Sequence, residues 1–255
     1  MQGDYKGIFQ RFKKEIKVIN MVKKLLAIIM AGVIMTTSTV LAKPQFTDVR
    51  GHWAESYIIK VVNEGVVDGV TDTMFVPDGQ VTRVQYLKMI MEATGLETVT
   101  PRSSECLDAG VGEWYAPYLQ SALDNGLIPS AMITGYKESV QYTVDDNGHA
   151  TESKVVYQGA FNGNTPITRE EMAVLTQYIY QFTRTILTSE IKDVVKVKGF
   201  ADGSEISDWA IISVNHTVMN GFMDGMDNNM FNPKDTATRA QAATVISRVL
   251  EKAGE

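Results

Sequence analysis

The chain has 255 residues, of which 44% are hydrophobic and 21% are charged, and its formal net charge is −6. This balance is typical of a globular protein and excludes a disordered or fibrous one. Cys106 is the single cysteine, so no intrachain disulfide can form and packing must supply the stability.

The N-terminal segment has the pattern of an export signal. Two lysines precede an apolar run from Leu25 to Met35, which is followed by small residues up to Ala42. The run is shorter than the roughly 20 residues of a membrane-spanning helix. We therefore expect a signal peptide at residues 21–42, cleaved after Ala42, and an exported protein. Residues 1–20 are interpreted as an N-terminal extension or a mis-called start.

The mature protein is expected to be strongly acidic. Without residues 1–42, 17 lysines and arginines remain against 28 aspartates and glutamates, a net charge of −11. Such a charge argues against nonspecific nucleic-acid binding. An anionic ligand would have to be held by local arginines.

Translation begins at Met1 or at Met21, and the sequence leaves this choice open.

Three copies of one sequence unit follow. In each copy an aspartate precedes a tryptophan, a glycine follows the tryptophan at a constant offset, and a Thr-Arg pair opens the second half. Such internal periodicity indicates a repeat protein. We call the copies the first, middle and last repeats and expect them at residues 43–99, 104–187 and 199–253.

Each repeat is predicted to form a helix, a loop and a second helix. Trp53, Ile58, Ile59 and Val62 fall on one face of the first helix, and Gly65 supplies its stop. Each second helix starts at a threonine with Gln or Glu three residues later, which is a capping box. These threonines are Thr82, Thr168 and Thr238.

The second helices carry an apolar stripe that one repeat cannot bury alone. We therefore expect the repeats to pack against one another as one mainly α-helical domain. The stripe consists of Leu87, Ile90 and Met91 in the first repeat and of Val245, Ile246 and Val249 in the last.

The middle repeat contains an insertion at about residues 129–159. Apolar and polar residues alternate on both sides of Asp145-Asp-Asn-Gly148, which predicts a β-hairpin. A surface decoration is the favoured interpretation, and the function of the insertion stays open.

One arginine in each repeat is a candidate ligand residue: Arg83, Arg169 and Arg239. Each lies at the first position of a helix, where a cation is mildly unfavourable, so helix stability does not explain it. Beside free backbone N–H groups, an arginine makes a good carboxylate or phosphate site. The alternative is an arginine that packs on an aromatic ring or pairs with an aspartate.

The tryptophans and aspartates have two interpretations each. Trp53, Trp114 and Trp209 are core residues, the favoured interpretation, or platforms that stack on sugars. The aspartates are helix caps or hydrogen-bond partners of a ligand hydroxyl. They are Asp48, Asp108 and Asp202.

The stretches FTDVRGHWAESYI and GVVDGVTDTMFVPDGQVTR resemble the S-layer homology (SLH) repeat, whose hallmarks are FxD, a Trp, a glycine loop with FxP, and TRAE. Here the last motif reads TRVQ, TREE and TRAQ. The resemblance covers nearly the whole mature chain. It implies a pseudo-threefold helical bundle at the cell surface, whose grooves between repeats bind a secondary cell-wall polysaccharide with a pyruvylated N-acetylmannosamine end.

The resemblance also implies roles for particular residues. The three arginines would hold the pyruvyl carboxylate, the three tryptophans would line the grooves, and the three aspartates would bond sugar hydroxyls. Gly69 and Gly225 would let the backbone approach the sugar. The middle repeat departs from the pattern, since it has Cys106 for the FxD phenylalanine and Ser130 for the loop glycine. Sites built on Arg83 and Arg239 are therefore ranked above the site on Arg169.

Catalysis is not expected. The three histidines occupy unrelated positions, and no nucleophile, cofactor or metal signature appears. The segment 224–229 is rich in oxygen ligands but lacks the spacing of an EF-hand. The competing interpretation is a surface-layer or envelope scaffold protein that acts mainly through protein–protein contacts.

Overall fold

The computed structural model describes residues 46–101, 107–184 and 199–254, all within one compact unit. The expected signal peptide, the segment 1–20 and Cys106 lie outside the described residues. Among those described, none of the helices combines the length and the apolar character needed to cross a membrane.

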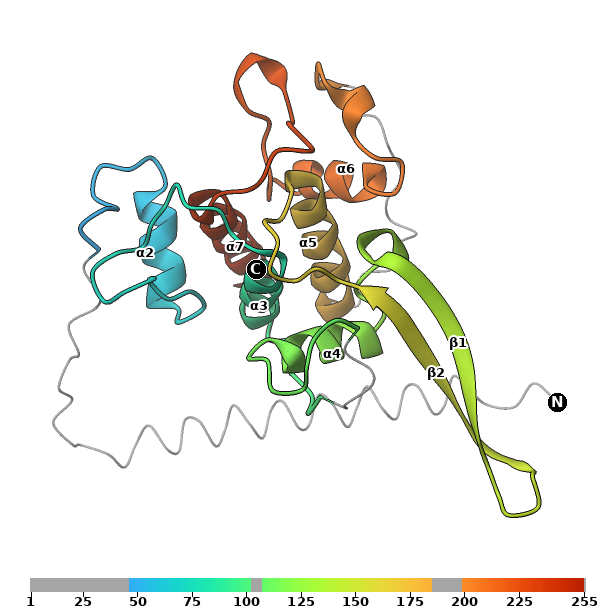
Figure 1. Cartoon of the computed structure of the whole chain (residues 1–255). Coiled ribbons are helices and arrows are strands. Elements are labelled where there is room, and N and C mark those ends of the chain that lie inside the picture. The colour runs from blue at the N-terminus through green and yellow to red at the C-terminus, as the bar shows by residue number, and fades with distance from the viewer. Residues whose placement is uncertain (1–45, 102–106, 185–198, 255) are drawn as a thin grey trace, which may run out of the picture. The chain divides into compact units, whose positions relative to one another are not determined.

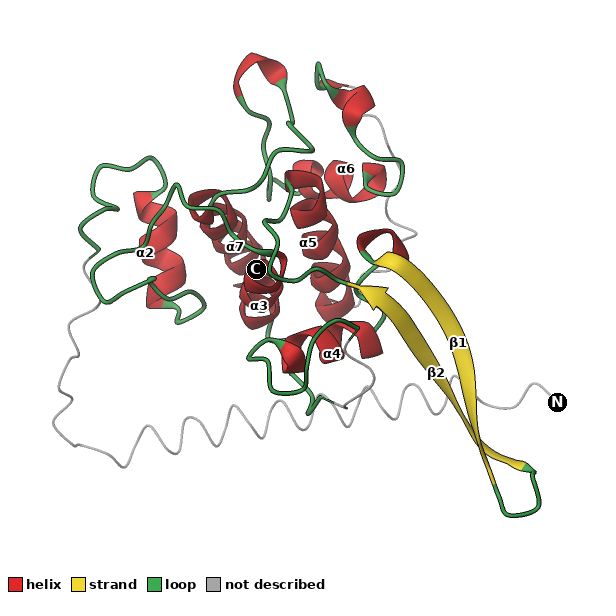
Figure 2. Cartoon of the chain, viewed as in Figure 1, coloured by secondary structure: helices red, strands yellow, loops and turns green. Residues whose placement is uncertain are grey.

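The described part of the chain is mainly helical, as predicted, with one two-stranded sheet (Figure 2). Each repeat contributes a first helix of nine residues and a longer second helix. The first helices are α2 (Glu55–Asn63), α4 (Ala116–Asp124) and α6 (Ile211–Met219), and the second helices are α3 (Arg83–Thr94), α5 (Arg169–Arg184) and α7 (Arg239–Gly254). Short 3-10 helices lie at η1 (Ser130–Met132), η4 (Gly203–Glu205) and η5 (Asp227–Asn229).

All three second helices begin with the predicted capping box. The threonine hydroxyl accepts a hydrogen bond from the backbone N–H three residues later, and the Gln or Glu at that position accepts one from the threonine N–H. Two otherwise unpaired donors are thereby satisfied at each helix start. The pairs are Thr82 with Gln85, Thr168 with Glu171 and Thr238 with Gln241.

The first helix buries only part of the predicted face. Ile58 is fully buried and Val62 packs against the core, as predicted, and Val61 is buried as well. Trp53 and Ile59 are exposed. For Trp53 the reason is that α2 begins only at Glu55, so this residue precedes the helix and does not share its face. The predicted stop at Gly65 is confirmed, because its φ of +72° lies in the left-handed region that glycine adopts without strain.

The helices pack in a cyclic order (Figure 1). The first helix of each repeat contacts the second helix of the preceding repeat: α4 contacts α3, α6 contacts α5, and α2 contacts α7. The last repeat thus packs back onto the first. At the centre, α3 contacts both α5 and α7. The predicted apolar stripe is buried there, which confirms Leu87, Ile90, Met91, Val245, Ile246 and Val249 as core residues.

Three backbone hydrogen bonds close the same ring. The Val81 N–H donates to the Ala237 carbonyl at 3.1 Å, the Ala237 N–H to the Ile167 carbonyl at 2.8 Å, and the Ile167 N–H to the Val81 carbonyl at 3.0 Å. Each residue lies directly before the capping threonine of its repeat, and all three are fully buried. The starts of the three second helices are therefore fixed relative to one another.

The insertion forms the predicted hairpin. Strands β1 (Thr134–Val144) and β2 (Ala150–Ala160) pair antiparallel, and they extend further toward the helices than the sequence pattern indicated. At the turn, Asp145 Oδ1 accepts hydrogen bonds from the Asn147 and His149 N–H groups, both at 2.9 Å. Figure 1 shows the turn pointing away from the helices.

Candidate functional site

The three tryptophans lie at the surface. Trp53 is 61% exposed, Trp114 52% and Trp209 36%, so the interpretation as core residues is wrong. Each lies two residues before the first helix of its repeat, outside the helical face that packs on the core. An exposed indole in each repeat offers a flat apolar face to a ligand.

The three aspartates hold the loops of their own repeats. Each carboxylate accepts hydrogen bonds from two successive backbone N–H groups, those of the loop phenylalanine and of the residue after it, at 2.6–3.0 Å. Neither a helix cap nor a free acceptor is formed. The loop pairs are Phe75 and Val76 for Asp48, Phe161 and Asn162 for Asp108, and Phe231 and Asn232 for Asp202.

The charge of Asp48 is stabilised by this contact. Burial raises the pKa of the Asp48 carboxyl, but the N–H groups of Phe75 and Val76 and the charge of Arg239 outweigh it, so the pKa is lowered. The carboxylate therefore stays ionised at neutral pH and keeps both bonds.

Each candidate arginine reaches into the loop of the next repeat. Its guanidinium donates to two loop carbonyls at 2.5–2.9 Å and lies 4.5–5.0 Å from the centre of the loop phenylalanine ring. The carbonyls belong to Phe161 and Met132 for Arg83, to Phe231 and Asp224 for Arg169, and to Phe75 and Asp68 for Arg239.

This pairing changes which arginine belongs to which groove. The sequence-based ranking took each arginine with the loop of its own repeat. In the structure, Arg83 holds the middle loop, which carries the insertion, and Arg169 holds the last loop, which matches the repeat pattern. Arg83 and Arg169 are both only 5% exposed. A main role of each guanidinium is therefore to join its own repeat to the loop of the next one.

The loop glycines make room for a phenylalanine. A Cβ at Gly69 would lie 2.3 Å from Phe46 Cε1, and a Cβ at Gly225 would lie 2.6 Å from Phe200 Cε1. Both distances are far below van der Waals contact, so glycine is required by the ring of its own repeat. The middle repeat has lost the ring and the glycine together, since its sequence has a cysteine and a serine at these positions.

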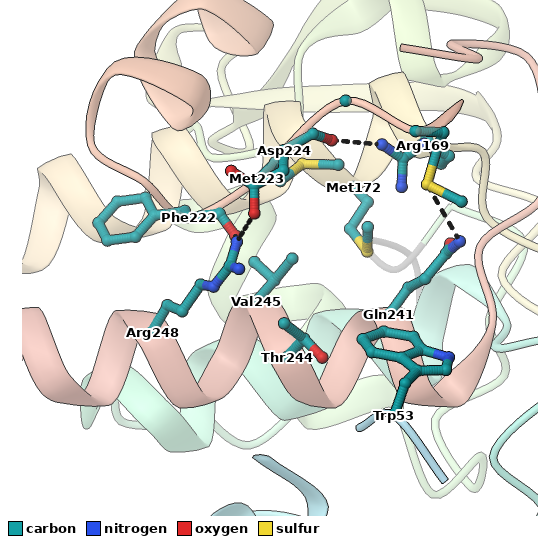
Figure 3. A pocket seen from close by; sticks show the side chains of 12 residues that line it. Trp53, Arg169, Met172, Phe222, Met223, Asp224, Gln241, Thr244, Val245 and Arg248 are labelled. Atoms are coloured by element: carbon teal, nitrogen blue, oxygen red, sulfur yellow. Dashed lines mark hydrogen bonds and ion pairs between the residues drawn. The ribbon is translucent and has the colours of Figure 1, made fainter. Parts of the chain in front are cut away.

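One pocket combines residues from all three repeats (Figure 3). Its volume is about 150 Å³. Trp53 comes from the first repeat and Arg169 and Met172 from the middle one. The last repeat supplies residues 222–226 of its loop and Gln241, Thr244, Val245 and Arg248 of α7. We call this pocket the last-loop groove.

The last-loop groove contains two arginines. Burial lowers the pKa of Arg169 to about 10, against the opposing charges of Asp235, Asp202 and Asp224, so it remains protonated at neutral pH. Burial also acts on Arg248, but Asp224 and Tyr57 outweigh it and raise its pKa. Arg248 Nη1 lies 2.7 Å from Asp224 Oδ2. The groove can therefore present two positive charges and an aromatic face to one ligand.

Sequence reasoning did not identify Arg248, which lies outside every repeat motif. The available signal was its position nine residues after Arg239, where the other repeats have Glu92 and Tyr178. The methionines of the groove were missed as well, because no motif contains them. They are Met172, Met223 and Met226.

The S-layer homology domain model matches residues 45–87 and 199–243. The chain therefore carries two S-layer homology domains. It is 31% identical over 209 residues, or 82% of its length, to an amylopullulanase of Thermoanaerobacterium thermosulfurigenes. It is also 30% identical over 207 residues, or 81% of its length, to the exoglucanase XynX of Acetivibrio thermocellus.

The chain spans only 10% and 16% of the lengths of these two proteins. A surface-layer 125 kDa protein of Lysinibacillus sphaericus is 30% identical over 142 residues, which is 55% of this chain and 10% of that protein. S-layer homology domains anchor proteins to the cell envelope, and these matches point to the cell surface.

Proposed function

We propose that this chain attaches non-covalently to the bacterial cell wall by binding an anionic secondary cell-wall polysaccharide with pyruvylated sugars. The proposed binding site is the last-loop groove. Pyruvylation adds a carboxylate to an otherwise neutral sugar, so its recognition requires a local cation in a protein of net negative charge.

The observation that carries this proposal is the exposed Trp53 beside two arginines in one pocket. A sugar presents apolar C–H faces that stack on an indole, and its pyruvyl carboxylate can accept charge-assisted hydrogen bonds from a guanidinium. The groove contains both groups, and a volume of about 150 Å³ leaves room for part of one sugar residue.

We further propose that the middle segment 104–187 is a third S-layer homology repeat. Its Asp108 and Phe161 make the contacts that the corresponding residues of the other repeats make, and its Arg169 reaches the next loop as Arg83 and Arg239 do. The insertion lengthens the loop of this repeat without removing these contacts.

The remaining predicted site residues would then act mainly as positioning residues. Asp202 orients the last loop, Arg169 joins it to the middle repeat, and Gly225 accommodates the Phe200 ring behind it. Arg169 also lines the groove, so it is the predicted arginine best placed for direct ligand contact.

We propose no catalytic activity for this chain. The names of the amylopullulanase and the exoglucanase describe proteins of which it spans 10% and 16%. The candidate residues recur in every repeat, which favours a binding role. A catalytic site would instead need one asymmetric set of groups.

Co-sedimentation with cell-wall sacculi tests the proposal. Residues 43–255 should sediment with untreated sacculi, and the bound fraction should fall after chemical removal of the pyruvyl groups. The Trp53→Ala variant should bind at least about tenfold more weakly, as expected for loss of an aromatic anchor at a binding site. Because Trp53 is 61% exposed, this variant should fold normally.

Tyr142→Ala provides the matched control. Tyr142 is 63% exposed and lies on the hairpin, so its loss removes an aromatic surface of similar exposure outside the groove. The control should bind like the wild type. Binding that depends on Tyr142 and ignores both Trp53 and pyruvylation would favour the envelope-scaffold alternative, in which the hairpin contacts a protein partner.

A further inference from the structure

The second helices of the three repeats differ in charge at one equivalent position, which in α7 lines the last-loop groove. Nine residues after the first arginine of each helix, α3 has Glu92, α5 has Tyr178 and α7 has Arg248. The same place in a repeated scaffold therefore carries a negative charge, no charge or a positive charge. Such a position is suited to make equivalent grooves select different ligands.

Arg248 contributes its charge to the last-loop groove, which it lines (Figure 3). Together with Arg169 and Asp224, it gives this groove a net charge of +1 at neutral pH. Two contacts position the Arg248 side chain: Nη1 donates to the Phe222 carbonyl at 3.3 Å, and the guanidinium lies 5.6 Å from the ring centre of Tyr57 on α2.

The corresponding surface of the first repeat has the opposite charge. There Arg239 donates to the Asp68 carbonyl, and Glu92 accepts a hydrogen bond from the Tyr118 hydroxyl at 2.6 Å. Arg239, Asp68 and Glu92 together give a net charge of −1. By repeat position these three residues correspond to Arg169, Asp224 and Arg248 of the last-loop groove, and we call the surface that they define the first-loop groove.

Asp224 can give up its contact with Arg248 at little cost. Its side chain is 67% exposed, whereas that of Arg248 is 23% exposed. When an external carboxylate approaches, Asp224 can turn into water and recover its hydration. Exposed ion pairs contribute little net stability, so exchange of the partner is not opposed by a large loss.

We propose that Arg248 is the residue that selects an acidic ligand group in the last-loop groove, and that Glu92 excludes the same group from the first-loop groove. The ligand carboxylate replaces Asp224 as the partner of Arg248. Of these two grooves, only the last-loop groove then binds an acidic glycan end. This inference rests on the proposed glycan-binding function and specifies which groove performs it.

Calorimetric titration of residues 43–255 with a pyruvylated N-acetylmannosamine glycoside tests this inference, with the unpyruvylated glycoside as the neutral probe. Arg248→Glu should weaken binding of the acidic probe at least about tenfold, since a charge-assisted bond is lost and a repulsion is added. Arg248→Lys keeps the charge and should stay within about threefold of the wild type.

Arg184→Glu is the matched control for the change in net charge. Arg184 is an exposed residue fifteen positions after Arg169 on α5, so it lies outside the groove. This variant should bind the acidic probe like the wild type. Thermal unfolding of each variant shows whether any loss of binding comes from loss of the fold.

The reciprocal change is a gain of binding. Glu92→Arg should raise the stoichiometry for the acidic probe from one to two, and Glu92→Gln should produce a weaker second site while keeping a partner for Tyr118. Trp114 precedes α4, which packs on α3, so its fluorescence should respond to the new site. Trp114→Phe identifies this signal.

Two results would overturn the inference and leave the proposed function intact. One is binding of the acidic probe that is equal in wild type, Arg248→Glu and Arg184→Glu. The other is a wild-type protein that fills both grooves. Absence of wild-type binding to both the acidic probe and sacculi would instead refute the proposed function, and this inference with it.

Discussion

At the scale of single residues, the residue types that recur in the repeats serve mainly to hold the loops in place. Asp202 holds the last loop by its backbone, Arg169 holds it from the neighbouring repeat, and Gly225 makes room for a ring. Loss of wall binding in an Arg169→Ala variant would therefore not prove direct contact. Trp53 and Arg248 are more informative positions, because the fold depends less on them.

Val76 is a strained residue in one of these loops. Its φ is +59°, in the left-handed region that β-branched residues rarely adopt, whereas the same position in the other loops has Asn162 and Asn232. We expect Val76→Asn to increase the free energy of unfolding by about 1 kcal/mol, because asparagine tolerates this conformation better.

Urea denaturation measures this change. Val70→Asn serves as the control, since Val70 is an exposed valine of the same loop whose φ is not positive. It should bring no gain. If Val76→Asn were neutral or destabilising, relief of backbone strain would be excluded as an account of this position.

At the scale of elements, the contact between α5 and α6 contains a buried histidine. His216 is 8% exposed and lies among the rings of Tyr180 and Phe222. Within the described residues, its Nδ1 is buried and has no hydrogen-bond partner. Protonation would place a charge in this buried contact between the middle and last repeats.

This burial predicts the pH dependence of stability. Burial lowers the pKa of His216, so the unfolded chain, with a histidine pKa of about 6.5, binds a proton more readily than the folded one. The stability is therefore complete above about pH 6.5 and is lost as the pH falls through the lower folded-state value.

Chemical denaturation of the wild type and of His216→Gln at pH 7.5 and 5.5 tests this expectation. The wild type should lose more free energy of unfolding between these pH values, since glutamine does not titrate and the other groups are common to both proteins. An equal loss would show that His216 does not link protonation to folding.

At the scale of the whole molecule, the repeats are joined in a closed ring. Each candidate arginine connects its repeat to the next, and Arg239 makes the connection from the last repeat back to the first, across more than 160 residues of sequence. Contacts between segments so far apart couple the first and last repeats in one folding unit.

Arg239→Ala should lower the free energy of unfolding by about 2–4 kcal/mol, because two charge-assisted hydrogen bonds and the contact with the Phe75 ring are lost. Urea denaturation followed by tryptophan fluorescence measures this loss. Arg184→Ala, which removes an exposed arginine, should cost much less. Equal costs for the two variants would contradict the role of Arg239 in joining the repeats.

The sequence by itself determined the local features of this protein. Capping boxes at Thr82, Thr168 and Thr238, the glycine stop at Gly65 and the hairpin turn at Asp145 depend on residues within a few positions of one another. The stripe of the second helices was also predictable, because a period of 3.6 residues identifies a buried face without knowledge of its partner.

Only the tertiary structure decided which residues are buried between these elements and which repeats contact one another. Trp53 fits an apolar helical pattern, yet it is exposed, because burial depends on where the helix begins and which neighbour covers it. Arg169 serves the loop of the last repeat, and the last-loop groove draws on all three repeats. Contacts between distant segments are set by packing, and no spacing within one repeat encodes them.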